Sequence, residues 1–227
     1  GKDFGNNSDK QIFDQYLNWC NKWLKQCIRI LKEDGTLFIY GFSETLSYIQ
    51  VKCLKKVFVR WLVWHYTNKT SPNSKYWQRS FESILSCSKK KIPFFNIDLC
   101  RESYSDAYKK TKPNKKRVAS TKSRFGNQES IYLVNELGAL PRDVIKIPTL
   151  AGGNKKEKVK HPTQKPLALC EKLIKATINK EKNFLVVPFS GSGSEVVAAK
   201  KLGIPFIGFE INKNYIEITE KRLNTVL

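Results

Sequence analysis

A run of small residues between two apolar segments is the part of this sequence best suited to binding a ligand. Residues 184–189 are largely apolar, as in a strand that is buried on both faces. Residues 190–193, Ser-Gly-Ser-Gly, allow the backbone to turn tightly and to approach a ligand closely. Residues 194–202 then predict a helix, and residues 205–211 predict a second buried strand, which carries Glu210 near its end. In such a unit the turn and the helix N-terminus hold the polar end of a nucleotide-like ligand, and the acid binds the ribose hydroxyls.

The glycine pattern bears on which nucleotide-like ligand is expected. Loops that bind dinucleotides carry a third glycine, and in this sequence Glu195 stands where that glycine would fall. The loop is therefore less suited to a nicotinamide or flavin dinucleotide. Adenosyl ligands without a pyrophosphate fit it better, above all S-adenosylmethionine.

Three motifs make a family resemblance specific. Residues 161–166 read His-Pro-Thr-Gln-Lys-Pro, and an amphipathic helix separates them from the glycine loop. Together with residues 188–195 (Pro-Phe-Ser-Gly-Ser-Gly-Ser-Glu) and residues 206–212 (Phe-Ile-Gly-Phe-Glu-Ile-Asn), this sequence resembles the amino-methylating DNA methyltransferases of the β arrangement. The resemblance covers most of the chain and is weakest between about residues 89 and 134.

The resemblance implies a division of the chain into three parts. Residues 1–88 would form the catalytic half of a methyltransferase domain, residues 89–150 a target-recognition insert with its return, and residues 151–227 the half that binds S-adenosylmethionine. The implied fold is α/β and Rossmann-like, with a largely parallel sheet, helices on both faces and a small basic insert. Independently, periodicity predicts alternating helices and strands in the first part. The predicted helices cover residues 8–32 and 43–55, and the first two predicted strands cover residues 36–42 and 57–64. Residues 78–87 are expected to start in a loop and to finish as a third strand.

The resemblance also assigns residues to the cofactor, which would be S-adenosylmethionine. Glu210 would bind the ribose, and the segment that begins at His161 would line the same pocket. Pro166 suits the first turn of a helix, so a purely structural role for this segment remains open. The expected cofactor-binding residues are Phe189, Ser190, Gly191, Ser192, Gly193, Ser194, Glu210, His161, Thr163, Gln164 and Lys165.

The sequence departs from the family pattern at two places. Family members commonly have an aspartate immediately before the Pro-Phe of the glycine loop, where this chain has Val187, and Glu195 is a candidate substitute. The catalytic Asp-Pro-Pro-Tyr tetrapeptide of the family would precede a loop such as residues 1–7, and this sequence contains no such tetrapeptide. We therefore assign no catalytic residue in this chain, and we expect the strand that bears the tetrapeptide to be missing as well.

The charge of the chain indicates a polyanionic partner. The formal net charge is +21, and residues 89–124 hold twelve lysines and arginines against three acids. Low hydrophobicity and the lack of periodicity predict a loop there, and residues 151–160 read as a flexible linker. The resemblance implies that the insert binds DNA through phosphates and base edges, whereas the alternative is a solvated basic loop. The expected DNA-binding residues are Lys109, Lys110, Lys112, Lys115, Lys116, Arg117, Lys122 and Arg124.

Other residue types narrow the class of protein. The six cysteines form no Cys-x-x-Cys pair and there are two histidines, so we expect reduced thiols, a cytoplasmic location and no metal site. No segment is long and apolar enough to predict a membrane span. Double-stranded DNA is the expected partner, and a cognate restriction endonuclease and a homodimer remain open. Arg79 could bind a phosphate or pair with Glu82, and the sequence favours neither.

Four functions follow from these patterns. The first is a DNA methyltransferase that acts on adenine N6, and a cytosine-N4 enzyme is the close alternative. The third is a non-catalytic DNA-binding module on a methyltransferase scaffold, which the missing tetrapeptide and Val187 favour. A nicotinamide dehydrogenase is disfavoured by the absent third glycine and by the basic insert.

Overall fold

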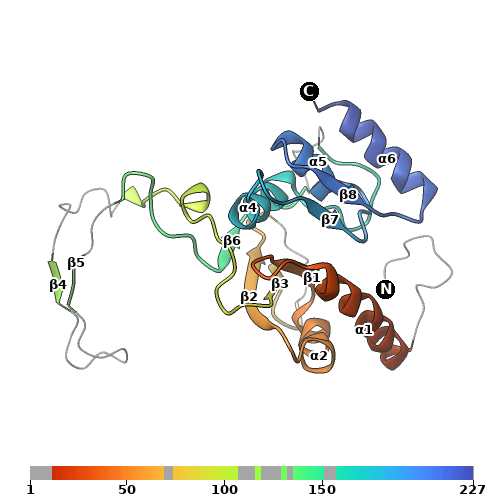
Figure 1. The fold of residues 1–227 in the computed structure, drawn as a ribbon, viewed down its shortest axis with the longest axis horizontal. Helices are drawn as coiled ribbons and strands as arrows, with labels where there is room; N and C mark the ends of the chain where they lie inside the picture. The colour runs from red at the N-terminus through yellow and green to blue at the C-terminus, as the bar shows by residue number, and fades with distance from the viewer. Residues whose placement is uncertain are drawn as a thin grey trace. The chain divides into compact units, whose positions relative to one another are not determined.

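The computed structural model describes residues 12–68, 74–106, 116–118, 129–131, 135–150 and 157–226 (Figure 1). The chain divides into two compact units. The larger unit comprises residues 1–96 and 143–227, and the smaller unit comprises residues 97–142. The three-part functional division at residues 88 and 150 stays a prediction.

A four-stranded mixed sheet lies in the larger unit. Its strands are β1 (Leu37–Gly41), β2 (Phe58–His65), β3 (Phe81–Ser88) and β6 (Val144–Lys146), in the order β1-β3-β2-β6 (Figure 1). β3 runs antiparallel to both β1 and β2, and β6 runs parallel to β2. The first three strands were predicted from the sequence within a few residues of these bounds.

The prediction of a largely parallel sheet is wrong for these strands. A parallel neighbour requires a crossover connection, which is usually a helix. Between β2 and β3 the described residues, 66–68 and 74–80, contain no helix, and the chain returns beside β2 in the opposite direction. A loop without a helix between two strands favours an antiparallel pair, and such a loop was predicted between β2 and β3.

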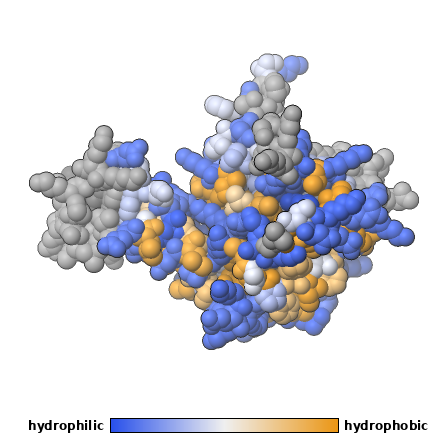
Figure 2. Space-filling view, turned by 90° about the horizontal axis from the view of Figure 1, so that it is seen from above, coloured by the Kyte–Doolittle hydropathy of each residue, from blue (hydrophilic) through white to orange (hydrophobic). Residues whose placement is uncertain are grey.

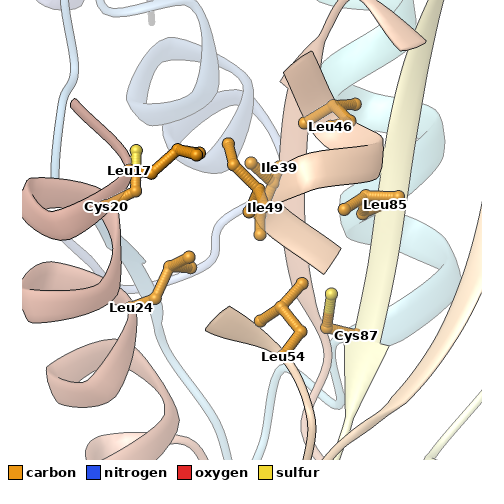
Figure 3. Close-up of a cluster of buried hydrophobic side chains, with 9 residues drawn as sticks. All are labelled: Leu17, Cys20, Leu24, Ile39, Leu46, Ile49, Leu54, Leu85 and Cys87. Carbon is orange, nitrogen blue, oxygen red and sulfur yellow. The ribbon is translucent and has the colours of Figure 1, made fainter. Parts of the chain in front are cut away.

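Helices cover both faces of this sheet, as predicted. α1 (Phe13–Ile30) and α2 (Ser43–Cys53) pack on one face. Figure 3 shows the buried side chains that fill the space between them and the strands, which are Leu17, Cys20, Leu24, Ile39, Leu46, Ile49, Leu54, Leu85 and Cys87. Ile84, next to Leu85 on β3, belongs instead to a second cluster with Leu169 and Leu173 of α4 (Leu167–Thr177). Successive residues of a strand point to opposite faces, so β3 supplies both cores.

The strand–loop–helix–strand unit lies against the other side of α4. β7 (Leu185–Val187) and β8 (Phe206–Gly208) form a parallel pair, and α5 (Ser194–Lys201) connects them. Cys170 and Ile174 of α4 pack on Ala198 and Ala199 of α5, whose small side chains let the two helices approach closely. Gly203, with a φ of +66°, follows the end of α5, where a residue in the left-handed conformation commonly ends a helix. The two apolar segments that flank the glycine loop are therefore adjacent parallel strands.

α1 reaches the glycine loop through aromatic side chains. Leu17, Cys20 and Leu24 recur at helical spacing on its buried face. Trp19 and Trp23 both contact the ring of Phe189, with centroid distances of 5.5 and 5.2 Å. The first helix and the last quarter of the chain thus share one aromatic cluster beside the loop.

The smaller unit contains a short ribbon. β4 (Lys116–Val118) and β5 (Glu129–Ile131) pair antiparallel, so the prediction of continuous loop over residues 89–124 is wrong at β4. Hydrogen bonds join the first and last parts of this unit: Arg101 donates to the Asp98 carboxylate at 2.7 Å and to the Gly138 carbonyl at 3.0 Å. The remaining predicted DNA-binding residues lie outside the described residues; they are Lys109, Lys110, Lys112, Lys115, Lys122 and Arg124.

The described surface is mainly hydrophilic on the face seen in Figure 2, with apolar residues between the polar ones. All six cysteines are free thiols. In the described parts of the chain, no three metal-binding side chains gather at one place. None of the described helices combines the length and the hydropathy that crossing a bilayer requires.

Candidate cofactor site

A cavity of about 340 Å³ opens beside the glycine loop, within the size range of small-molecule sites. The cavity brings together residues from the ends of β1 and β3, the segment before α4, the loop and α5. Its lining residues are Tyr40, Gly41, Phe42, Glu82, His161, Thr163, Lys165, Phe189, Ser190, Gly191, Ser192 and Glu195. Seven of the predicted cofactor residues therefore face one cavity, and those seven are His161, Thr163, Lys165, Phe189, Ser190, Gly191 and Ser192.

At two positions of the loop, both the backbone angles and the closeness of neighbouring atoms require glycine. Gly191 and Gly193 have φ values of +50° and +74°. A Cβ on Gly191 would lie 2.8 Å from His161 Nε2, and one on Gly193 would lie 2.5 Å from Thr219 Cγ2. The His161 ring is itself held by Tyr215, at a centroid distance of 4.5 Å. The bend can pack this tightly because neither position carries a side chain.

Glu210 lies beside the loop and accepts hydrogen bonds from three backbone amides. Its Oε2 accepts a hydrogen bond from the Gly191 amide at 2.8 Å, and its Oε1 accepts from the amides of Ile211 and Asn212 at 2.9 Å each. Its carboxylate has about four lone-pair sites, so acceptor capacity is left for a ribose hydroxyl. Ribose binding by Glu210 stays a prediction.

Ser194 ties the loop to the segment before α4, and Arg222 ties it to α6 (Lys213–Asn224). Ser194 Oγ donates to the Lys165 carbonyl at 2.7 Å. Arg222 Nη1 donates to the Ser192 carbonyl and, at 3.2 Å, to Ser194 Oγ. Gly193, Ser194 and Glu210 do not line the cavity, and cofactor binding by these three residues stays a prediction. Arg222 is not among the predicted site residues, because an arginine near the end of a polar helix resembles any surface residue.

Gln164 has a structural role in this geometry. Its amide donates to the Glu157 carbonyl and accepts from the Val159 amide, both at 2.8 Å. Glu157 Oε1 in turn accepts from the Leu167 amide at 2.7 Å and so caps the start of α4. These bonds hold residues 157–160 in place, so the predicted flexible linker is wrong for that part, while residues 151–156 lie outside the described residues.

A buried ion pair crosses the cavity wall. Lys165 Nζ lies 2.8 Å from Glu82 Oε2, and their side chains are 13% and 20% exposed. The Lys165 ammonium also lies 5.3 Å from the centre of the Tyr40 ring. Arg79 pairs with Glu44 at 2.6 Å, so the predicted alternative of an Arg79–Glu82 pair is wrong. No local pattern pointed to Glu82 or Tyr40, because they meet Lys165 only through the pairing of distant strands.

Burial raises the pKa of Glu195 above the usual range of a carboxyl group. Its own backbone amide and the cations Lys165 and Arg222 act in the opposite direction. Burial likewise raises the pKa of Tyr40, so this phenol stays neutral at physiological pH. The cavity therefore combines a paired lysine, a neutral phenol and a carboxylate whose charged form is costly.

The sequence model of a family described as DNA methylase, covering N6 and N4 methyltransferases, matches residues 1–221. The chain belongs to this DNA methylase family. The type II methyltransferase M.HpaI of Haemophilus parainfluenzae is 33% identical over 99% of this chain and 65% of its own length. The DNA adenine methyltransferase YhdJ of Escherichia coli K12 is 26% identical over 99% of this chain and 72% of its own. The chain thus spans about two thirds of the length of these curated relatives.

The fold agrees with that family. The crystal structure of the M1.HpyAVI–SAM complex superimposes with a TM-score of 0.61 and 27% identity, covering 93% of this chain and 83% of the other. The α/β class and the methyltransferase type of fold predicted from the sequence are confirmed, with the sheet corrected from largely parallel to mixed.

Proposed function

We propose that this chain belongs to an S-adenosylmethionine-dependent DNA methyltransferase that methylates an exocyclic base amine, with adenine N6 as the target. The observation that carries the proposal is the open cavity at the glycine loop. It is lined at once by the loop and by residues of the His-Pro-Thr-Gln-Lys-Pro segment. Family membership and the relatedness to an adenine methyltransferase support the same reading.

The residues present fit S-adenosylmethionine. Because Gly191 carries no side chain, its backbone approaches His161 closely and the loop stays open toward the cavity. Glu210 would hold the ribose, Phe189 would form an apolar wall, and Thr163 and Lys165, which line the cavity, would contact the polar end of the molecule. The cofactor, when bound, supplies an electrophilic methyl group on a sulfonium.

The protein would do its work by positioning. An exocyclic amine is a weak nucleophile and lies inside the duplex, so the target base has to be flipped out to reach the methyl group. Alignment of amine and methyl, with water excluded, then supplies most of the rate. The sequence holds no Asp-Pro-Pro-Tyr tetrapeptide to accept the amine hydrogens, so binding is the decisive measurement for this chain.

The basic character of the chain supports DNA as the partner. With a net charge of +21, association with a polyanion is favourable and weakens as salt rises. We assign the phosphate contacts to the basic residues of the insert. The backbone of Lys116 and Arg117 forms β4, which gives this part of the insert an ordered frame.

Calorimetric titration with S-adenosylmethionine and S-adenosylhomocysteine tests the proposal. We expect saturable one-to-one binding of both, and no binding of NADH at the same concentrations. Transfer of tritiated methyl to DNA, followed by digestion to nucleosides, then separates N6-methyladenine from N4-methylcytosine. A chain that binds DNA and neither adenosyl compound would instead be a DNA-binding module on a methyltransferase scaffold, the alternative favoured by Val187 and by the missing tetrapeptide.

A further inference from the structure

Glu195 is a cavity-lining carboxylate that lacks a partner cation in the described structure. It is the second residue of α5, directly after the glycine loop. The two cations that act on it electrostatically are engaged elsewhere. Lys165 pairs with Glu82 at 2.8 Å, and Arg222 donates to the main chain of the glycine loop. Among the described residues, no lysine or arginine forms an ion pair with Glu195 within 4.0 Å.

Of the described side chains, two carboxylates and one lysine line the cavity. They are Glu195, Glu82 and the Lys165 that pairs with Glu82. A carboxylate removed from water is costly unless a cation or hydrogen bonds compensate it. The raised pKa of Glu195 expresses this cost as a stronger hold on a proton. In the cavity lining, Lys165 pairs with Glu82, and in the part of the chain that the structure describes no second lysine or arginine lines the cavity beside Glu195.

The other acids near the loop have a partner or an assigned role. Glu82 pairs with Lys165, and Glu210 accepts from three backbone amides and is assigned to the ribose hydroxyls. At the end of β7, where the loop begins, the chain has the buried and apolar Val187. Glu195, which has hydrogen bonds from its own backbone amide and from the Cys170 thiol, is thus the cavity-lining carboxylate without an ion-pair partner among the described residues.

The ligand proposed above carries such a group, and this step rests on that proposed function. We propose that Glu195 binds the α-ammonium group of the methionine moiety of S-adenosylmethionine. The bond would be a charge-assisted hydrogen bond inside the cavity. Glu195 would thereby substitute, from the opposite end of the loop, for the aspartate that family members commonly have at the position of Val187.

A structural role is the competing explanation. An acid in the first turn of a helix is stabilised by the helix dipole and by free backbone amides. In that case Glu195→Gln would destabilise the free protein and leave ligand affinity unchanged. The proposed role predicts the reverse, because the amide removes a costly buried charge and also removes the partner of the ammonium.

The experiment compares wild type, Glu195→Gln and Glu220→Gln by calorimetry and by thermal unfolding without ligand. Glu220 is exposed on α6 and gives the same change of charge away from the cavity. Three ligands distinguish a contact with the ammonium group from a contact with the sulfonium. S-adenosylmethionine has the ammonium and the sulfonium, S-adenosylhomocysteine has the ammonium alone, and 5′-methylthioadenosine has neither.

We expect Glu195→Gln to weaken both S-adenosyl ligands by roughly tenfold to a hundredfold, the range of a hydrogen bond between charged groups. Affinity for 5′-methylthioadenosine should change less than about twofold, which corresponds to well under 1 kcal/mol. The unliganded variant should unfold at the same or a higher temperature than wild type, and Glu220→Gln should match wild type throughout.

Three results would overturn the inference while leaving the proposed function intact. The first is an unchanged affinity of Glu195→Gln for S-adenosylhomocysteine. The second is a loss of affinity confined to S-adenosylmethionine, which would place Glu195 at the sulfonium. The third is an equal loss of affinity for all three ligands, which would indicate a distorted loop. If wild type bound none of the three ligands, the proposed function itself would fail, and the inference with it.

Discussion

Lys165 and Glu82 form a close ion pair, 2.8 Å from Nζ to Oε2, in which both side chains are largely buried. The pair joins the segment before α4 to the start of β3, which are far apart in the sequence. The contact between Lys165 and Ser194, which follows the glycine loop, uses the main chain: the backbone carbonyl of Lys165 accepts a hydrogen bond from Ser194 Oγ. One residue therefore fixes the cavity wall with its side chain and the loop with its main chain.

Breaking this pair on one side should be costly. Lys165→Met leaves the Glu82 carboxylate buried without its cation, and we expect a loss of about 2 kcal/mol or more in the free energy of unfolding. Replacing both residues, as in Lys165→Met with Glu82→Leu, should lose less than the two single losses added together. Urea denaturation of the four proteins completes the double-mutant cycle. Strict additivity would show that the two side chains do not interact.

The loop glycines should tolerate a methyl group very unequally. Gly193→Ala brings both a positive φ and a contact of 2.5 Å with Thr219 Cγ2, so we expect a loss of more than about 2 kcal/mol. Gly203→Ala is the matched control, because its φ is +66° and nothing lies within 4 Å of the added atom. It should lose only the conformational part, about 1 kcal/mol. Similar losses at the two sites, measured by chemical denaturation, would mean that the Thr219 contact has no weight.

Glu195 should make the stability of the free protein depend on pH. Burial raises its folded pKa, so the folded state holds the proton more tightly than the unfolded state does. The contribution of Glu195 to the free energy of unfolding is therefore fully present below its pKa in the unfolded state. It is lost as the pH rises through its pKa in the folded state. Lys165, Arg222 and Cys170 face the same carboxyl, and the two cations oppose the shift.

The stability difference between Glu195→Gln and wild type should consequently grow in favour of the variant as the pH is raised from acid to neutral. Thermal unfolding across this range measures the difference, with Glu220→Gln as a pH-matched reference. A difference that instead turned against the variant near neutral pH would show that the charged carboxylate stabilises α5.

Neutralising part of the insert should change how DNA binding depends on salt. Replacing Lys115, Lys116 and Arg117 with glutamine should lower DNA affinity and reduce the slope of log affinity against log salt by about 0.9 for each lost phosphate contact. A control with three exposed lysines of the larger unit, Lys22, Lys25 and Lys221, separates specific contacts from net charge. Equal slopes in the two triple variants would place the insert away from the DNA backbone.

Local periodicity predicted most of the elements that position the site. The apolar runs around the glycine loop became β7 and β8, and the helical spacing of Leu17, Cys20 and Leu24 became the buried face of α1. These patterns succeed because burial of one face is written into a short stretch of sequence. The direction of β3, which is antiparallel to its neighbours, was predicted wrongly. It depends on the connection between β2 and β3, whose described residues contain no crossover helix.

The part of the site that escaped prediction depends on contacts between distant residues. Tyr40 and Glu82 come from strand ends, and Arg222 comes from the last helix. Each is of an ordinary type for its local position, and only the folded arrangement brings it to the loop. Gln164 shows the converse: its place in the motif suggested a ligand contact, whereas its amide is used by the main chain of Glu157 and Val159.

The bond from Arg222 to the Ser192 carbonyl has a practical implication for work with this protein. The ligand-facing bend is held by a side chain of α6 that does not itself line the cavity. Replacing or truncating that side chain would loosen the bend from behind. Such versions would lose affinity for reasons unrelated to any residue that touches the bound molecule.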